Sequence, residues 1–205
     1  MLFRSYGAVK FVTSKEIVKK YKNDLKKDNI ICESTFSDIK NINDYSKYMV
    51  YELHKHINTE YVLVIQYDGF VINPSSWRQE FLEYDYIGAP WVYRENAYVT
   101  PFGEHVRVGN GGFSLRSKKL LEVPLKTEIP FDCTKGDFYK HFNANNFNED
   151  GCIAVHNRHL YEEQGCKFAP LEVAVHFSHE TTIPENHGII PFGFHGNLPI
   201  GVTLE

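Results

Sequence analysis

Apolar and polar residues alternate in two patterns along the N-terminal third of the chain, one typical of strands and one typical of helices. Residues 8–13 predict a strand, and Ser14 caps a lysine-rich amphipathic helix that follows it. Residues 29–33 predict a second short strand. Between residues 43 and 57, apolar side chains recur every three or four positions, which predicts a helix that leads directly into residues 61–65.

Residues 61–65 (YVLVI) are a continuous apolar run, the pattern of a strand covered on both faces in the middle of a parallel sheet. Strand–helix–strand alternation around this run predicts right-handed crossovers and a mostly parallel central sheet flanked by helices. The run ends at Gln66, and Asp68 and Gly69 follow. A carboxylate just past the end of a central strand lies where open α/β sheets bind ligands, although an ordinary turn also uses Asp and Gly.

Three further segments carry turn and loop signals. Residues 83–91 predict a short strand that ends in a Gly/Pro turn with a tryptophan at its tip, and residues 93–104 show no periodicity. In residues 106–116, three glycines surround Asn110 between two strand-like halves. This pattern indicates either a bulge or tight chain crossing, or backbone amides presented to a ligand.

The C-terminal third begins with an irregular stretch over residues 125–148 and continues with a helix over residues 149–164. Glu149 and Asp150 lie in the first turn of this helix, where the helix dipole favours carboxylates, so they could serve as caps alone. Near the C-terminus, a short apolar strand pair carries His195 between two glycines.

Composition and charge narrow the class of protein. The chain has 205 residues, of which 42% are hydrophobic and 23% charged, as expected for one α/β domain spanning residues 1–205. Its net charge of -4 gives no general attraction to nucleic acid or to an anionic membrane. A nucleotide-binding protein of this charge needs a local cation, most simply a metal ion, beside the phosphates. No apolar run is long enough to predict a membrane span.

The cysteines and histidines show no metal-binding spacing. Cys32, Cys133, Cys152 and Cys166 are far apart and include no C-x-x-C pair, so we expect reduced, mostly buried thiols and a cytoplasmic location. The ten histidines include no H-E-x-x-H motif, which favours surface and packing roles over a structural zinc site.

The first predicted strand lies almost at the start of the sequence, where a nucleotide-binding α/β sheet normally has an earlier strand and a ligand-facing loop. Two interpretations are open. Either the fold is unusually small, or it lacks its first strand here because the native start lies upstream.

Several segments together resemble a family of small glycosyltransferase-like domains, many of them described only as domains of unknown function and related to the GT-A superfamily. In chain order these segments are QYDGFVINP, FLEYDYIGAPW, VGNGGFSLRS, a carboxylate pair that opens a helix, and FGFHG. The resemblance covers residues 8–196 and implies a Rossmann-like, nucleotide-diphospho-sugar transferase fold.

The resemblance also implies a divalent metal that binds the diphosphate of a nucleotide-sugar. In GT-A enzymes an aspartate-rich turn after a central strand holds this metal, and here Gln66 replaces the usual first aspartate whereas Asp68 keeps the metal-binding position. His195 resembles the C-terminal histidine that some GT-A families add as a ligand. A carboxylate with an imidazole suits Mn²⁺ better than Mg²⁺.

The remaining roles follow from the same resemblance. Inverting GT-A enzymes commonly use the Asp of an E-D pair as the general base, which assigns that role to Asp150, with Glu149 binding the acceptor or orienting its neighbour. The residues expected to bind the donor are Gln66, Tyr67, Asp68, Asn110, Gly111 and Gly112. The residues expected to offer a face to the acceptor sugar are Trp91 and Tyr93.

The leading hypothesis is therefore a transferase that moves a sugar from a UDP- or GDP-linked donor to a glycan or glycoconjugate, in surface polysaccharide or glycoconjugate synthesis. A glycoside hydrolase also uses two carboxylates, roughly 5–9.5 Å apart, but it leaves the glycine-rich segment and His195 without a role. The third hypothesis is an inactive sugar- or nucleotide-binding module, since a fold does not guarantee chemistry.

Overall fold

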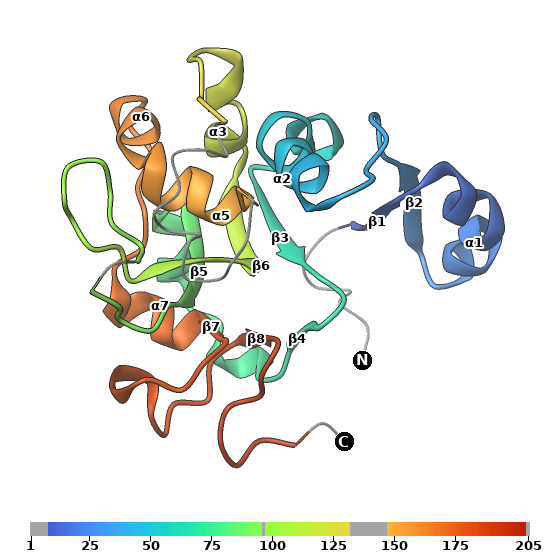
Figure 1. Cartoon of the computed structure of the whole chain (residues 1–205). Coiled ribbons are helices and arrows are strands. Elements are labelled where there is room, and N and C mark those ends of the chain that lie inside the picture. The colour runs from blue at the N-terminus through green and yellow to red at the C-terminus, as the bar shows by residue number, and fades with distance from the viewer. Residues whose placement is uncertain (1–7, 96, 132–146, 204–205) are drawn as a thin grey trace.

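Three small sheets, rather than one large sheet, organise the chain (Figure 1). The computed structural model describes residues 8–95, 97–131 and 147–203. In spatial order, the strands within the described residues are β1 (Val9–Thr13) and β2 (Ile30–Ser34); β3 (Tyr61–Ile65), β6 (Val108–Ser117) and β5 (Tyr86–Pro90); and β4 (Gly69–Val71), β8 (Gly193–His195) and β7 (Ser178–His179). The protein is a mixed α/β domain.

The N-terminal strand–helix–strand unit confirms the prediction from periodicity. Helix α1 (Lys15–Lys27) connects β1 to β2, which pair in parallel. Ser14 is the N-cap, and its side chain accepts a hydrogen bond from the Ile17 amide. In Figure 1 this unit, in blue, lies beside helix α2 (Ile42–Tyr51), with α1 on its outer side.

The prediction of a mostly parallel central sheet is wrong. Strand β3 pairs antiparallel with β6, and β6 pairs antiparallel with β5, so only β1–β2 and β7–β8 are parallel within the described residues. Strand β3 is also an edge strand of its sheet, with a half-buried pattern. A continuous apolar run shows that a strand is covered, but it carries no information about the direction of its neighbour.

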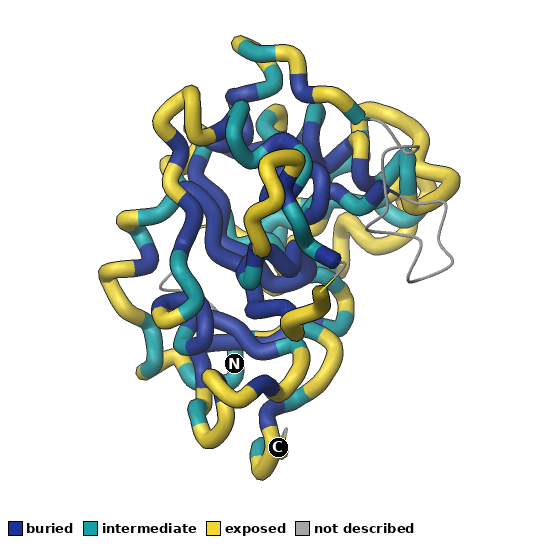
Figure 2. Tube along the Cα trace, turned by 60° about the vertical axis from the view of Figure 1, so that its left-hand side comes forward, coloured by how far each residue is buried: buried dark blue, intermediate teal, exposed yellow. Residues whose placement is uncertain are grey.

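Strand β6 is the central strand of the antiparallel sheet β3–β6–β5, and it is buried at all ten positions. Figure 2 shows that buried backbone fills the middle of the molecule and that exposed backbone lies mainly at its periphery. The glycine-rich segment was expected to separate two halves, but the strand is continuous through it. The extra residues are accommodated in the pairing with β5, which shifts register between Ile87 and Ala89 and again before Pro90.

Several of the other helical elements pack against this sheet. The predicted helix over residues 149–164 is present but divided, because a π-helical turn interrupts it. The remaining helices are α3 (Lys118–Leu121), α5 (Glu149–Gly151), the π-helix Cys152–His156, α6 (Arg158–Glu163) and α7 (Leu171–Phe177), with 3₁₀ turns at Leu53–His56, Pro74–Ser76, Gln79–Glu83, Val123–Leu125 and Pro184–Asn186.

Strand β6 lies between two apolar clusters and also carries buried polar side chains on one face, because successive side chains point to opposite faces. Phe113 and Leu115 face a cluster that also contains Phe81, Phe177 and Phe192. Ser114 and Arg116 point to the other face and are also fully buried. A strand that buries a charged residue in this way requires partners for it, and these partners lie at the site described next.

None of the helices in the described part of the chain is long and apolar enough to cross a membrane. Cys32 and Cys166 are free thiols, and Cys152 and Cys166 are buried, as expected for most of the cysteines. Cys133 lies outside the described residues.

Candidate functional site

Segments that are far apart in the sequence line one cavity of about 320 Å³. They are helix α2, the turn after β3, the loop after β5, strand β6, the start of α5, the residue after β7 and the end of β8. The residues that line the cavity are Ile42, Tyr45, Gln66, Trp91, Tyr98, Asn110, Gly112, Asn148, Glu149, Asp150, Glu180 and His195. The structure therefore brings together Gln66, the Asn110 segment, the E-D pair and His195.

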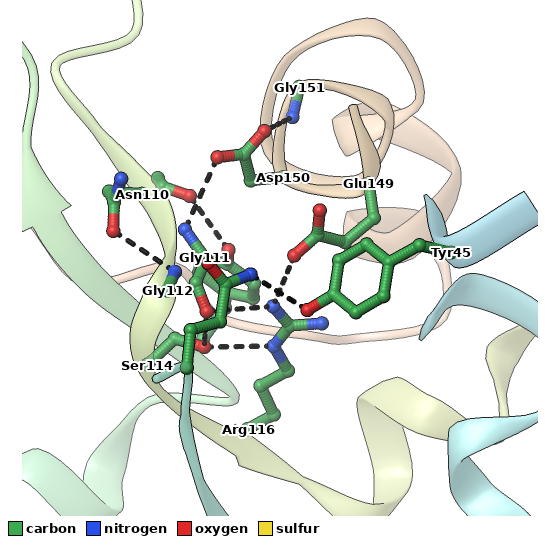
Figure 3. Close-up of polar contacts among 12 residues, drawn as sticks. Tyr45, Asn110, Gly111, Gly112, Ser114, Arg116, Glu149, Asp150 and Gly151 are labelled. Carbon is green, nitrogen blue, oxygen red and sulfur yellow. Dashed lines mark hydrogen bonds and ion pairs between the residues drawn. The ribbon is translucent and has the colours of Figure 1, made fainter. Parts of the chain in front are cut away.

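The Asn110 segment of β6 forms one wall of this cavity, and its backbone amides donate hydrogen bonds to side chains of the site (Figure 3). The Gly112 amide donates a hydrogen bond to Asn110 Oδ1 over 3.0 Å, and the Gly111 amide donates to Asp150 Oδ2 over 3.2 Å. A Cβ at Gly111 would overlap the Glu149 carboxylate, and a Cβ at Gly112 would overlap the His195 ring. Glycine is required at both positions because of this close approach.

Arg116 ties the E-D pair to strand β6 (Figure 3). Its guanidinium is fully buried and donates to Glu149 Oε1 over 3.0 Å and to the Gly111 carbonyl over 3.3 Å, while Nε donates to Ser114 Oγ over 3.0 Å. Glu149 is itself only 4% exposed. This buried ion pair favours the role of Glu149 in orienting its neighbour over direct contact with an acceptor.

Asp150 lies between two backbone amides at the start of α5. Its Oδ2 accepts from Gly111 and its Oδ1 accepts from its neighbour Gly151 over 2.7 Å. Burial, together with the negative charges of Glu149 and Glu180, nevertheless raises the pKa of Asp150 to about 7. A carboxyl group with a pKa near neutrality is suited to accept a proton in a reaction.

Asp68 and His195 approach each other beside the cavity. Asp68 Oδ1 lies 3.2 Å from His195 Nε2, and Glu180 Oε1 lies 3.5 Å from His195 Nδ1. The Glu180 carboxylate, followed by the charge of Asp68, raises the pKa of His195. Strand pairing explains the approach, because Gly69 in β4 pairs with His195 in β8.

The residues present fit a divalent cation that is shared with a ligand. Within the described residues, no group of three or more His, Cys, Asp or Glu side chains could hold a metal by itself. Asp68 and His195 supply two donors, and Asp68 Oδ1 is buried without a hydrogen-bond partner in the described structure. Two protein donors are sufficient where substrate phosphates complete the coordination shell, as is usual for Mg²⁺.

The aromatic residues are arranged differently from the sequence prediction. Trp91 lines the cavity, but it is 4% exposed and its ring stacks on Tyr98, with centroids 4.1 Å apart. Tyr93 is exposed and contacts the His105 ring, and Tyr67 is 93% exposed at the turn, so neither lines the cavity.

Tyr98 has a left-handed backbone with φ 58°, a conformation that is strained for a side chain of this size. Since it lines the cavity, it replaces Tyr93 as the candidate aromatic surface for a sugar.

Gln66 donates a hydrogen bond to the Tyr45 hydroxyl over 2.7 Å. Tyr45 also lines a second cavity of about 600 Å³, so the two cavities share one wall. The second cavity lies at the carboxyl ends of the parallel strands β1 and β2, next to the N-terminus of α1. Its polar lining includes Thr13, Ser14, Lys15, Thr35, Asp38 and Lys40.

Four residues of the site were not predicted from the sequence, because none of them lies in a binding or catalytic motif. Tyr45 was interpreted as one apolar position of a helix stripe, and Arg116 as part of a strand. Tyr98 lies in a loop without periodicity, and Glu180 follows β7 with no motif around it. The opposite phase of Ser114 and Arg116 relative to the apolar residues of β6 was the only available signal.

Searches of curated proteins and of solved structures found no match, whereas comparison with models of protein families did. The chain matches the family described as "Protein of unknown function (DUF5672)" over residues 29–195, which include the second strand, both carboxylates of the E-D pair and His195. Because this match covers most of the sequence, the chain belongs to the DUF5672 family.

Proposed function

We propose that this protein is a glycosyltransferase that moves a sugar from a nucleotide-sugar to a glycan or glycoconjugate acceptor. One observation carries the proposal: the Asn110 segment, Asp150 and His195 come from three distant parts of the chain and line one cavity, and Asp68 approaches His195 beside it. A purely structural role for these residues gives no reason for two carboxylates and an imidazole to gather at one place.

The second cavity supports a nucleotide-linked donor. It lies at the carboxyl ends of parallel strands and at a helix N-terminus, where α/β proteins commonly bind nucleotides. Since Tyr45 borders both cavities, a nucleoside in the larger cavity would place its diphosphate near Asp68 and its sugar near Asp150.

The charge of the smaller cavity makes a cation necessary for this ligand. Glu149, Asp150 and Glu180 line it, and the fully buried Arg116 is already bound to Glu149. A diphosphate would therefore meet net negative charge unless a divalent ion lay beside Asp68 and His195. Such an ion, when bound, stabilises the negative charge that develops on the departing diphosphate.

Asp150 is the proposed general base. As the acceptor hydroxyl oxygen attacks the anomeric carbon, the bond from that carbon to the diphosphate oxygen breaks and the hydroxyl proton moves to Asp150. The Gly111 and Gly151 amides hold the carboxylate in place for this transfer. A single displacement of this kind inverts the anomeric configuration.

The first test is thermal stabilisation by UDP- and GDP-sugars with and without Mn²⁺. A ligand at 100 times its dissociation constant stabilises the fold by about 2.7 kcal/mol, which raises the melting temperature by several degrees. We expect this shift only when Mn²⁺ is present, and we expect Asp68→Ala to remove its metal-dependent part. No shift with any nucleotide-sugar, or equal shifts after Asp68→Ala, would contradict the donor site.

A second test is the pH dependence of transfer. Because the pKa of Asp150 is raised to about 7, the active carboxylate predominates above this pH and its protonated form below it. The ratio kcat/KM, which reports pKa values of the ligand-free protein, is therefore expected to fall about tenfold per pH unit below pH 7. A kcat/KM that stays constant down to pH 5 would exclude Asp150 as the base.

The second candidate is a module that binds a nucleotide-sugar without transferring it, and Gln66 is the observation that favours it. Its amide is committed to Tyr45 where a typical GT-A turn has a metal-binding aspartate. Donor binding without product formation over a panel of acceptors would support this candidate.

A further inference from the structure

One carboxylate, Glu180, lies between two residues of the site that belong to different strands. Its Oε1 accepts a hydrogen bond from Asn110 Nδ2 over 2.7 Å, and the same oxygen lies 3.5 Å from His195 Nδ1. The Asn110 amide, oriented in this way, turns its own Oδ1 to the Gly112 backbone amide. Glu180 therefore orients the Asn110 side chain in β6, and it also faces the His195 ring in β8.

The His195 ring lies between two carboxylates, and its Nδ1 forms no hydrogen bond in the described structure. Glu180 faces Nδ1, Asp68 Oδ1 lies 3.2 Å from Nε2, and the absence of a side chain at Gly112 leaves the space that the ring occupies. With Nδ1 directed to Glu180, the nitrogen that faces Asp68 is Nε2. Nε2 of His195 and Oδ1 of Asp68 are therefore the two donor atoms available to a cation.

We propose that Glu180 is a positioning residue that orients His195, so that Nε2 and Asp68 together bind a divalent cation. The inference rests on the metal-dependent donor site of the proposed function. Metal-binding histidines usually direct their other ring nitrogen to a carboxylate or carbonyl, and loss of that partner commonly lowers metal affinity 10–100-fold. The described residues form no three-ligand group, in agreement with a supporting role for Glu180 rather than direct ligation.

The test is calorimetric titration of the full chain with MnCl₂ in the presence of UDP or GDP, with the heat of the same titration of nucleotide alone subtracted. Glu180→Ala removes the oxygen that faces both partners, and we expect Mn²⁺ affinity to fall about 10–100-fold. Glu180→Gln keeps an acceptor oxygen at this position, so it should recover most of the affinity. Glu180→Leu, which has no acceptor oxygen, gives a second variant should the alanine variant fail to fold.

The matched control is Glu185→Gln, in the same C-terminal segment. Glu185 forms a partly exposed ion pair with Arg107 and does not line the cavity, so its loss should leave Mn²⁺ affinity unchanged. Wild-type affinity in both the Ala and Leu variants of Glu180 would overturn the inference alone. Failure of the wild type to bind Mn²⁺ would overturn it together with the proposed metal site, whereas absence of sugar transfer with the expected affinities would remove only the proposed function.

Discussion

Asp150→Asn is expected to reduce sugar transfer by about 10²–10⁴-fold while the affinity for the nucleotide-sugar stays within a few-fold of the wild type. The amide cannot accept the acceptor proton, but it has the same shape and retains an oxygen for one of the two backbone amides, from Gly111 or Gly151. The loss should therefore appear in the turnover rate and not in the concentration of donor that half-saturates the enzyme.

A matched control lies further along the same helical segment. Glu162→Gln changes a carboxylate that pairs with Arg158 on the outer side of α6, 2.7 Å away, and it should leave the turnover rate unchanged. A rate for Asp150→Asn equal to that of this control would show that another group accepts the proton, and Glu180, which lines the same cavity, would be the next candidate.

Local structure in this protein could be predicted because its signals are local. Ser14 accepts the hydrogen bond of the helix that follows it, and the stripe around Tyr48 and Met49 is buried as its spacing predicts. The direction of strand pairing is a property of two distant segments. The apolar run of β3 is compatible with a parallel or an antiparallel neighbour, and the structure places an antiparallel β6 beside it.

In the candidate site, too, residues with a local motif could be predicted and residues that depend on distant partners could not. Asp68, Asn110, Asp150 and His195 were identified because each lies in a motif that resembles a family, and the motifs meet in space. Glu180 lies in no motif, and its role follows only from the distances to Asn110 and His195. Residues that act by orienting others leave little trace in a single sequence, because their chemistry depends on partners that are distant along the chain.

Burial of charge links the ion pair of the site to the raised pKa of Asp150. Strand β6 places Arg116 against the Glu149 carboxylate, and no cation among the described residues pairs with the neighbouring Asp150. The ion pair thus anchors the start of α5 while the second carboxyl of the pair retains a raised pKa. The family match includes both halves of this arrangement, since residues 29–195 contain Arg116 as well as the E-D pair.

Arg116→Met is expected to destabilise the fold by about 3–5 kcal/mol, measured as the free energy of unfolding in urea. The substitution leaves Glu149 buried without its charge partner and removes the guanidinium that packs 5.3 Å from the centre of the Tyr86 ring. Arg116→Met combined with Glu149→Gln should recover part of the loss, because the second change removes the uncompensated charge. Lys27→Met is the control, since it breaks an exposed ion pair with Asp24 that contributes less than about 1 kcal/mol. Equal losses for Arg116→Met and Lys27→Met would show that the buried pair does not anchor α5 to the sheet.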